Sequence, residues 1–246
     1  MNKKKSKNKP KVIKTIKPIS NNNLFTEVQK NSIISTVIEY ARAHPEMLTP
    51  SMKKVDKNII DIKIKKNISI TLDKVIETNN KRTTSPDELT SLYLENYYGH
   101  QKNNRNLYID GYAVQKKAEM QIGELLELYI QKEFFKYGWC CSGSTIEHVD
   151  FIKKKKNNWE VFQIKNSDNT ENNAASGVRK IENKQGIKKW VRRNSTYGLN
   201  EYINQKKILN LYFWDGYPDE DIKIKLSEDG FRIFIKSYFN NITQAN

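Results

Sequence analysis

The chain has 246 residues, 37% of them hydrophobic, and a formal net charge of +15 at pH 7. This length suits one domain that buries a full core, with an appended tail or small subdomain. No apolar stretch approaches the roughly 18 residues of a membrane span, and the lysine-rich N-terminus lacks the apolar centre of a signal peptide. These features argue against a membrane protein, and we expect a cytoplasmic one.

The positive charge is concentrated in two segments. Residues 1–20 hold eight lysines and no acid, and residues 153–193 hold twelve Lys or Arg residues against four acids, so each segment carries +8 and the rest of the chain −1. A localised basic segment is typical of proteins that bind a polyanion, most often nucleic acid. We expect residues 1–20 to form a disordered arm that is either solvated or in non-specific contact with DNA.

Residues 21–110 are predicted to form a mainly helical N-terminal part that packs on the core. A helix is expected over Leu24–Ala43 and should stop before Pro45, whereas the alternation over Ile59–Leu72 favours a strand or hairpin. A capping-box pattern predicts a further helix within Ser85–Gly99. The first helix is predicted from the spacing of Phe25, Val28, Ile33, Val37 and Tyr40.

Residues 111–246 are predicted to form an α/β core, because helices and strands alternate along them. Helical spacing predicts a long helix over Gly111–Tyr137, ended by Gly138, with Glu124 and Glu127 on the side opposite the core. The residues expected to face the core are Ala118, Ile122, Leu125, Leu126, Tyr129 and Ile130.

Two strands should follow this helix. They are predicted over Thr145–Ile152 and Trp159–Lys165, with Lys153–Lys156 in a solvated turn that touches at most the DNA backbone. The adjacent Cys140 and Cys141 fit neither a disulfide framework nor a zinc site and should be small residues at the start of a strand. The elements expected beyond them are a basic segment with Trp190 in the core, a strand over Ile208–Trp214, an alternating run at Ile222, Ile224 and Leu226, and a helix after Ser227.

Three polar residues on the two central strands carry the clearest functional signal. Gln163 and Lys165 share one face of their strand, and Phe162 and Ile164 share the other, which should be the core face. Asp150 joins the polar pair if the two strands are neighbours. A carboxylate that holds a divalent cation, beside a lysine that orients or polarises the attacking water, is the chemistry of a metal-dependent nuclease.

This arrangement resembles the PD-(D/E)XK nuclease superfamily, and residues 123–193 resemble the SinI-type family of type II restriction endonucleases. The matching segments are GELLELYI (Gly123–Ile130), YGW (Tyr137–Trp139), VDFI (Val149–Ile152), QIKNSDNTEN (Gln163–Asn172), VR (Val178–Arg179) and IKKWVR (Ile187–Arg192). The resemblance implies a mixed central sheet flanked by helices and Mg²⁺-dependent hydrolysis of duplex DNA at a specific site, of the GGWCC kind. It also implies a homodimer, because two-fold DNA symmetry is matched by a two-fold protein, and no small organic cofactor.

The resemblance also implies a role for each site residue. Asp150 would be the main metal ligand and Lys165 the lysine next to the attacked phosphate. Gln163 stands where a second acid is expected, so it would give the metal a neutral oxygen or only a hydrogen bond. Glu127 would be the acid from the preceding helix, with Glu124 as the alternative. A neutral ligand implies weak metal binding until DNA supplies phosphate oxygens.

The segment after Lys165 is the expected DNA-contacting region. Short polar side chains there can bond to phosphates or base edges, and arginine can bridge O6 and N7 of guanine. The residues predicted to contact DNA are Asn166, Ser167, Asn169, Asn172, Arg179, Lys188, Arg192 and Arg193. Two alternatives remain open: a non-catalytic nucleic-acid-binding protein, and a structure-specific or repair nuclease on the same core.

Overall fold

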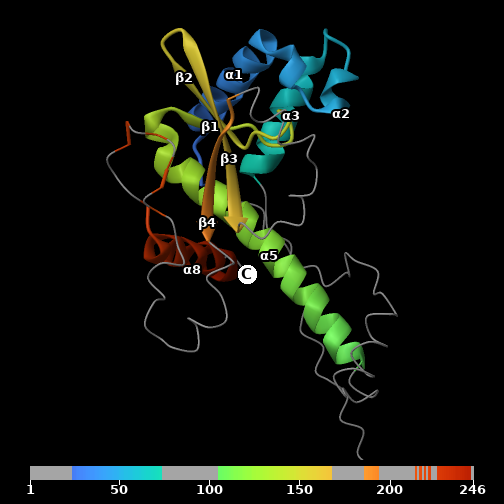
Figure 1. The fold of residues 1–246 in the computed structure, drawn as a ribbon, viewed down its shortest axis with the longest axis vertical. Coiled ribbons are helices and arrows are strands. Elements are labelled where there is room, and N and C mark those ends of the chain that lie inside the picture. Colours follow the sequence, from blue (N-terminus) through green and yellow to red (C-terminus); the bar gives the residue numbers. More distant parts are fainter. Residues whose placement is uncertain are drawn as a thin grey trace, which may run out of the picture.

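The chain folds around a mixed four-stranded sheet with the order β1-β2-β3-β4. A computed structural model describes residues 24–73, 105–167, 186–193 and 226–244, with 214, 216, 217, 219, 221 and 222 between them. The strands are β1 (Trp139–Cys141), β2 (Phe151–Lys155), β3 (Asn158–Ser167) and β4 (Lys188–Arg193). The first three pair antiparallel and β3 pairs parallel with β4. Helices pack against this sheet (Figure 1), so the α/β prediction is confirmed.

The first helix, α1 (Glu27–Ala43), forms where the sequence predicts it. Thr26 caps it: its Oγ1 accepts a hydrogen bond from the Gln29 N–H, and the Gln29 Oε1 accepts one from the Thr26 N–H. Val28 belongs to the apolar spacing that predicts this helix but is 79% exposed, because the buried stripe contains Ile33 and Val37 instead. The chain then passes through the short helices η1 (Pro45–Met47) and α2 (Pro50–Lys53).

The segment predicted as a strand or hairpin is the helix α3 (Ile60–Leu72), so that prediction is wrong. Its isoleucines fit two periods at once. Ile64 and Ile68 are buried against α1 at a spacing of four, while Ile62 and Ile70 are exposed. The tertiary contact with α1 therefore selects the helical stripe over the alternating one.

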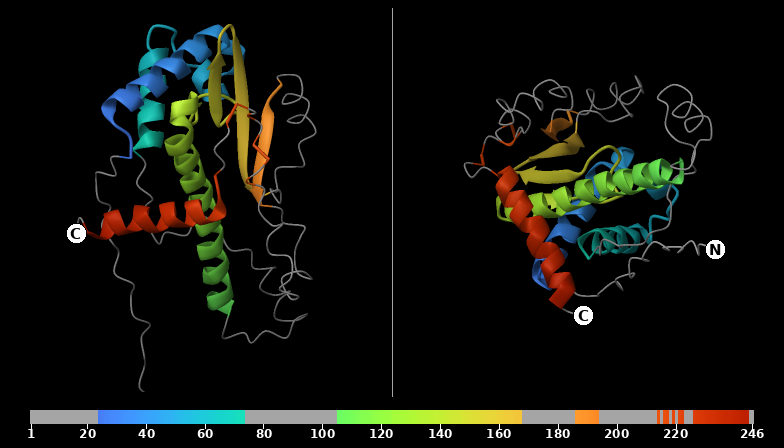
Figure 2. Two further views of the ribbon diagram at one scale, coloured as in Figure 1. Left: turned by 90° about the vertical axis from the view of Figure 1, so that its left-hand side faces the viewer. Right: turned by 90° about the horizontal axis from the view of Figure 1, so that it is seen from below.

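The long helix α5 (Arg105–Phe134) begins before the predicted start and continues into η3 (Phe135–Tyr137). Gly138, at φ +82°, ends it in the left-handed conformation that favours glycine. Ala118 was expected in the core but is exposed. The N-terminal half of α5 extends beyond the other described elements (Figures 1 and 2), and the α5 residues known to be buried lie in its C-terminal half.

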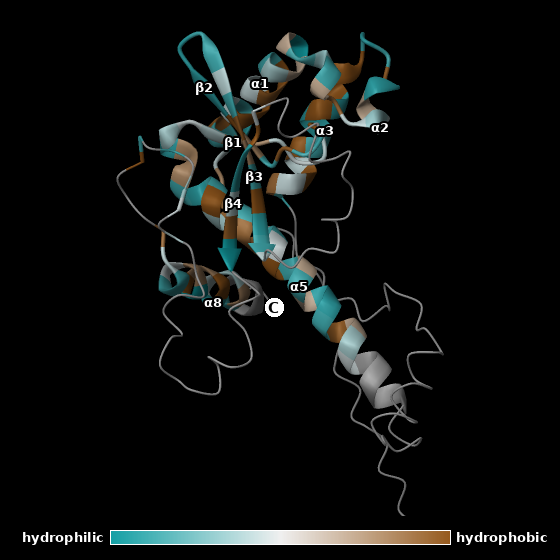
Figure 3. Ribbon diagram, viewed as in Figure 1, coloured by the Kyte–Doolittle hydropathy of each residue, from teal (hydrophilic) through white to brown (hydrophobic). Residues whose placement is uncertain are grey.

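The strand predicted from Thr145 begins only at Phe151, because residues 145–150 form turns, with His148 at φ 60°. The second predicted strand is confirmed as β3. Lys153–Lys155 belong to β2 and not to the turn, which is only two residues long. Figure 3 shows the hydrophilic tip of this hairpin beyond the apolar part of the sheet.

An aromatic core joins the sheet to α5 and to α8 (Glu228–Gln244), which begins directly after Ser227 as predicted. Trp139 of β1 stacks on Phe162 of β3 at 4.1 Å between ring centroids. Trp190 of β4 is buried, as predicted, and stacks on Tyr217 at 4.7 Å. Cys140 and Cys141 are free and buried in β1, but they lie at the middle and end of this strand and not at the start of one as predicted.

Several predicted elements lie outside the described residues: the arm at 1–20, the helix within Ser85–Gly99, and most of the strand at Ile208–Trp214. The alternating run at Ile222, Ile224 and Leu226 is described only in part. None of the helices in the described ranges is both long and apolar enough to cross a membrane.

Candidate active site

Asp150 forms hydrogen bonds with nearby residues through both its backbone and its side chain. Its N–H donates to the Phe162 carbonyl at 2.9 Å, and its own carbonyl accepts from the Ser142 N–H at 2.8 Å. Its Oδ2 accepts a hydrogen bond from the Ile164 N–H at 2.6 Å. Ile164 lies between Gln163 and Lys165 in β3, so the carboxylate is held beside both residues. The structure therefore brings together the acid, the amide and the lysine that the sequence singles out.

The surroundings of Asp150 make its ionised form less stable than that of an exposed carboxyl. Burial raises the pKa of this carboxyl above its usual value of 3.8, while the Ile164 hydrogen bond and the charge of Lys165 act in the opposite direction. A carboxylate taken out of water is stabilised by a nearby cation. One lysine does not offset the burial, so the site has unsatisfied negative charge that a divalent cation would stabilise.

Gln163 has a buried oxygen that is suited to the same cation. Its side chain is 5% exposed, and its Oε1 has no hydrogen-bond partner among the residues that the structure describes. Such an oxygen typically costs about 1–3 kcal/mol when it is left unsatisfied. Hard cations such as Mg²⁺ bind neutral amide oxygens as well as carboxylates. The residues present therefore fit a divalent ion next to Asp150 and Gln163.

A cleft of about 440 Å³ opens beside Asp150 and is lined by two acids of α5, Glu124 and Glu127. Both acids are half-buried, and both reach the cleft because three residues span about one helical turn. The structure thus brings either candidate helix acid to the side of Asp150. The remaining lining residues are Asn67, Ile70, Thr71, Leu128, Gln131, Cys141, Gly143 and Ser144.

The carboxylates present do not form a complete metal cage. Among the residues that the structure describes, no three His, Cys, Asp or Glu side chains lie close enough together to hold a metal ion by themselves. Mg²⁺ is commonly bound through one or two carboxylates together with substrate phosphates. The donor set at Asp150 matches that mode of binding.

Strand register divides the predicted DNA-contacting residues between two faces of the sheet. In the parallel pair, Lys165 lies opposite Val191 and Ser167 lies opposite Arg193, so Ser167 and Arg193 share the face of Lys165. Asn166, Lys188 and Arg192 lie on the other face by the same alternation. Lys189, opposite Gln163, joins the first face and is exposed; sequence reasoning did not single it out, and strand register is the signal that identifies it.

The residues on the second face are engaged within the fold. Arg192 is 7% exposed; its Nε donates to Asn166 Oδ1 at 2.8 Å and its Nη1 lies 2.7 Å from a Glu228 carboxylate oxygen of α8. Lys188 forms an ion pair with Glu160. Asn169, Asn172 and Arg179 lie outside the described residues.

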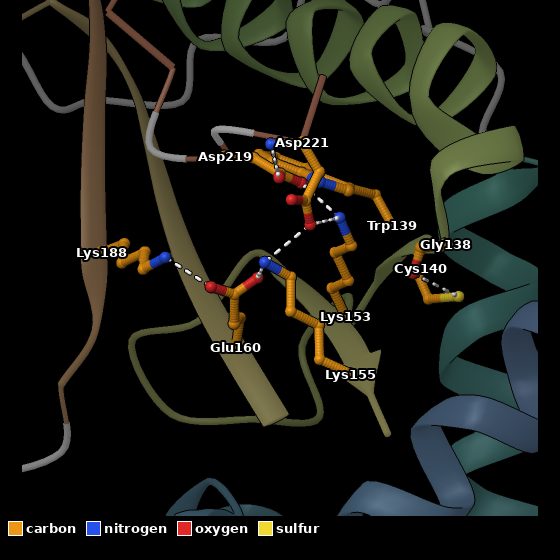
Figure 4. A network of polar contacts seen from close by, with 9 residues as sticks. All are labelled: Gly138, Trp139, Cys140, Lys153, Lys155, Glu160, Lys188, Asp219 and Asp221. Atoms are coloured by element: carbon orange, nitrogen blue, oxygen red, sulfur yellow. Dashed lines mark hydrogen bonds and ion pairs between the residues drawn. The ribbon is translucent and has the colours of Figure 1, made fainter. Parts of the chain in front are cut away.

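Figure 4 shows that lysines of β2 are also neutralised internally. Lys153 is buried, and its Nζ lies 2.8 Å from Oδ2 of Asp219, which also accepts a 2.6 Å hydrogen bond from the Trp139 indole. Burial opposes the ionisation of Asp219, but these two hydrogen bonds outweigh it and lower the pKa of this carboxyl. Lys155 pairs with Asp221 at 2.7 Å. The prediction of a solvated turn is therefore wrong for Lys153, because its side chain forms a buried ion pair with Asp219.

Comparison with known proteins identifies the family of this chain. The chain belongs to the SinI restriction endonuclease family, whose sequence model matches residues 16–241. It is 37% identical over 163 residues to the type II restriction enzyme Eco47I of Escherichia coli. It is 36% identical, over the same length, to the type II restriction enzyme SinI of Salmonella infantis. Each match covers 65% of this chain and 64% of the relative, just under two thirds of the relative's length. The family resemblance seen in the sequence is confirmed.

Proposed function

We propose that the protein is a type II restriction endonuclease with a PD-(D/E)XK core, which hydrolyses phosphodiester bonds at a specific site in duplex DNA with Mg²⁺. The observation that carries the proposal is the hydrogen bond that holds the Asp150 carboxylate between Gln163 and Lys165. That bond fixes the acid next to the segment of β3 that carries the lysine. Membership in the family supports the reaction class.

Three side chains would hold the metal. Asp150 would supply a carboxylate oxygen, Gln163 its unsatisfied Oε1, and Glu127 or Glu124 a carboxylate from across the cleft. When bound, Mg²⁺ supplies Lewis acidity toward the charge that develops on the phosphate. The neutral Gln163 leaves the site short of negative charge, so phosphate oxygens of DNA would complete the ligand set.

Lys165 would act on the attacking water and the phosphate. Its ammonium group lies near enough to Asp150 to lower the pKa of that carboxyl. From that position it would orient a water in line with the bond to be broken and offset charge on the phosphate oxygens. The water oxygen would form the new bond to phosphorus, and the bridging oxygen would leave with a proton.

The face of the sheet that carries Lys165 is the proposed DNA contact. Ser167 and Arg193 continue that face toward the end of the strands, and Lys189 adds an exposed positive charge. Arg192 would position β4 through Glu228, while Asn169, Asn172 and Arg179 remain candidates for contact on sequence grounds. A homodimer on a short near-palindromic site, of the GGWCC kind, is the corresponding assembly.

The domain organisation proposed with this function has three parts. Residues 1–20 would be a basic arm, residues 21–110 a mainly helical part, and residues 111–246 the nuclease core with the DNA-contacting segment. The contacts of α1 with β1 and β2 support the packing of the second part on the core.

Incubation of the full chain with unmethylated phage DNA and Mg²⁺ tests the proposed function. Discrete fragments are expected. Binding without cleavage would instead indicate a nucleic-acid-binding protein, and cleavage restricted to branched or damaged DNA would indicate a structure-specific or repair nuclease. The variants Asp150→Ala and Lys165→Ala should lose cleavage and retain DNA binding.

A further inference from the structure

One buried glutamine of α5 forms hydrogen bonds with the side of β1 that has no strand partner in the described part of the chain. The Gln131 side chain is 1% exposed. Its Oε1 accepts a hydrogen bond from the Cys141 N–H at 2.5 Å, and its Nε2 donates one to the Trp139 carbonyl at 2.9 Å. A primary amide is a side chain that offers one acceptor and one donor in the same plane, as a neighbouring strand does.

The register of the sheet explains why these two backbone groups need a partner. β1 is an edge strand, and the hydrogen bond from Ser142 to Asp150 continues its ladder with β2. In an antiparallel ladder every second residue turns its N–H and C=O away from the neighbour. Trp139 and Cys141 are those residues, and Gln131 pairs with the C=O of Trp139 and the N–H of Cys141.

Gln131 lies on the same face of α5 as the two acids of the cleft. Glu127 precedes it by four residues and Glu124 by seven, the spacing of a single helical stripe, and all three line the cleft beside Asp150. The negative charge of Glu127 also contributes, after burial, to the high pKa of the Cys141 thiol. The helix acids are therefore close to the end of β1 that Gln131 holds.

A short path of hydrogen bonds connects this contact to Asp150. Gln131 binds the N–H of Cys141, and the N–H of the next residue, Ser142, donates to the Asp150 carbonyl at 2.8 Å. The Asp150 carboxylate is in turn held by Ile164 of β3. This path links the acids of α5 to the acid beside β2, in addition to the direct packing of α5 on β1 and β3.

We propose that Gln131 is a positioning residue, which sets the separation of the α5 acids from Asp150 and thereby the affinity of the site for a divalent cation. The inference rests on the proposed function for the identity of the site. Removal of groups that orient metal ligands typically lowers metal affinity about 10–100-fold. Gln131→Met keeps the length of the side chain and removes both hydrogen bonds.

The test compares the full chain with Gln131→Met and with a matched control, Gln115→Met, in the exposed half of the same helix. Mn²⁺ binding is followed by the electron paramagnetic resonance signal of the free ion, and cleavage of phage DNA is titrated with Mg²⁺. We expect the half-saturating Mn²⁺ and Mg²⁺ concentrations to rise about tenfold or more in Gln131→Met, with neither changed in Gln115→Met. Cleavage at saturating Mg²⁺ should recover toward that of the unaltered chain.

A purely structural role would lower the thermal midpoint and leave both half-saturating concentrations unchanged, and that result would overturn the inference. Gln131→Asn, which keeps the amide on a shorter side chain, repeats the comparison if the methionine variant does not fold. Normal metal binding and cleavage by a folded variant refute the role of Gln131 alone. Absence of cleavage by the unaltered chain refutes the proposed function, and the Mn²⁺ titration still tests Gln131.

Discussion

The Asp150 carboxylate accepts a hydrogen bond from the Ile164 N–H at 2.6 Å, so the strand that carries Gln163 and Lys165 also fixes the acid that precedes β2. Backbone donors are rigid, which makes this bond a geometric constraint on the site as well as an electrostatic one. The acid cannot shift without disturbing β3.

Cleavage should decline on the acid side at a higher pH than for an ordinary carboxylate. Burial raises the pKa of Asp150 above 3.8, and the ionised form is the one that attracts a cation, so activity is lost as the pH falls through the raised value. Without metal, the folded protein binds this proton more tightly than the unfolded chain does. The free energy of unfolding should therefore decrease as the pH rises from about 3.8 through the raised pKa of Asp150.

Cleavage rates measured over a range of pH at two Mg²⁺ concentrations check this prediction. The acid midpoint should move to lower pH at the higher concentration, because Mg²⁺ competes with the proton for Asp150. A midpoint that is independent of Mg²⁺ would show that another group controls the acid limb.

Replacement of Gln163 by methionine should separate stability from metal binding. The change removes a buried oxygen that no described residue hydrogen-bonds, so the free energy of unfolding should rise by about 1 kcal/mol. The Mg²⁺ concentration for half-maximal cleavage should rise as well, because a ligand is lost. Gln163→Glu should lower that concentration and destabilise the metal-free protein. Denaturation curves of the two variants give the free energy of unfolding, and Mg²⁺ titrations give the half-saturating concentration. A change opposite to the expected one in either quantity would refute the role assigned to Gln163.

Two neighbouring arginines of β4 should behave differently when replaced by alanine. Arg193→Ala removes an exposed charge on the face of Lys165, so DNA affinity should fall and the salt dependence of binding should lessen by about one ion. Arg192→Ala breaks a buried ion pair with Glu228 and should lower the free energy of unfolding by about 3 kcal/mol. Binding isotherms at several salt concentrations and thermal melts distinguish the two, and an identical profile for both variants would contradict the division of faces.

The buried pair of Lys153 and Asp219 should contribute to stability and not to DNA binding. Asp219→Asn leaves the lysine without its counter-charge in the core, so the free energy of unfolding should fall by about 3–5 kcal/mol. The double variant Lys153→Met/Asp219→Asn should recover much of this loss. Since the pKa of Asp219 is lowered in the fold, its contribution is present above about 3.8 and is lost as the pH falls through the folded value. Denaturation of Asp219→Asn and of the unaltered chain at two pH values measures this contribution. An equally large loss of unfolding free energy at a pH below the folded pKa would contradict the role assigned to the pair.

Local patterns in the sequence predicted the parts of the fold that have one dominant period. α1, the C-terminal half of α5, β3 and the start of α8 formed as expected because one stripe or one alternation accounted for their apolar residues. α3 was missed because its isoleucines satisfy both periods, and only contact with α1 decides between them. The start of β2 was missed because residues 145–150 turn back over the end of β1, a tertiary feature without a local signal.

The part of the candidate site that depends only on the alternation of side chains along one strand could be predicted from the sequence. Alternation alone places Gln163 and Lys165 on one face. The faces of Arg192 and Arg193 could not be assigned from sequence, because they depend on the register of β4 with β3. Gln131 was missed for a related reason: a glutamine in an amphipathic helix resembles any polar residue until the edge strand that it satisfies is known.

Digestion of unmethylated phage DNA by the full chain and by Asp150→Asn tests whether the protein cleaves DNA at specific sites with Asp150 as an essential group. Asp229→Asn, which changes an exposed acid of α8, is the matched control. We predict one reproducible set of fragments from the full chain and from the control in Mg²⁺. No fragments are expected from Asp150→Asn, which should still bind DNA, or from any of the three in excess chelator. The same fragments from Asp150→Asn, or an absence of fragments from the full chain, would contradict the account.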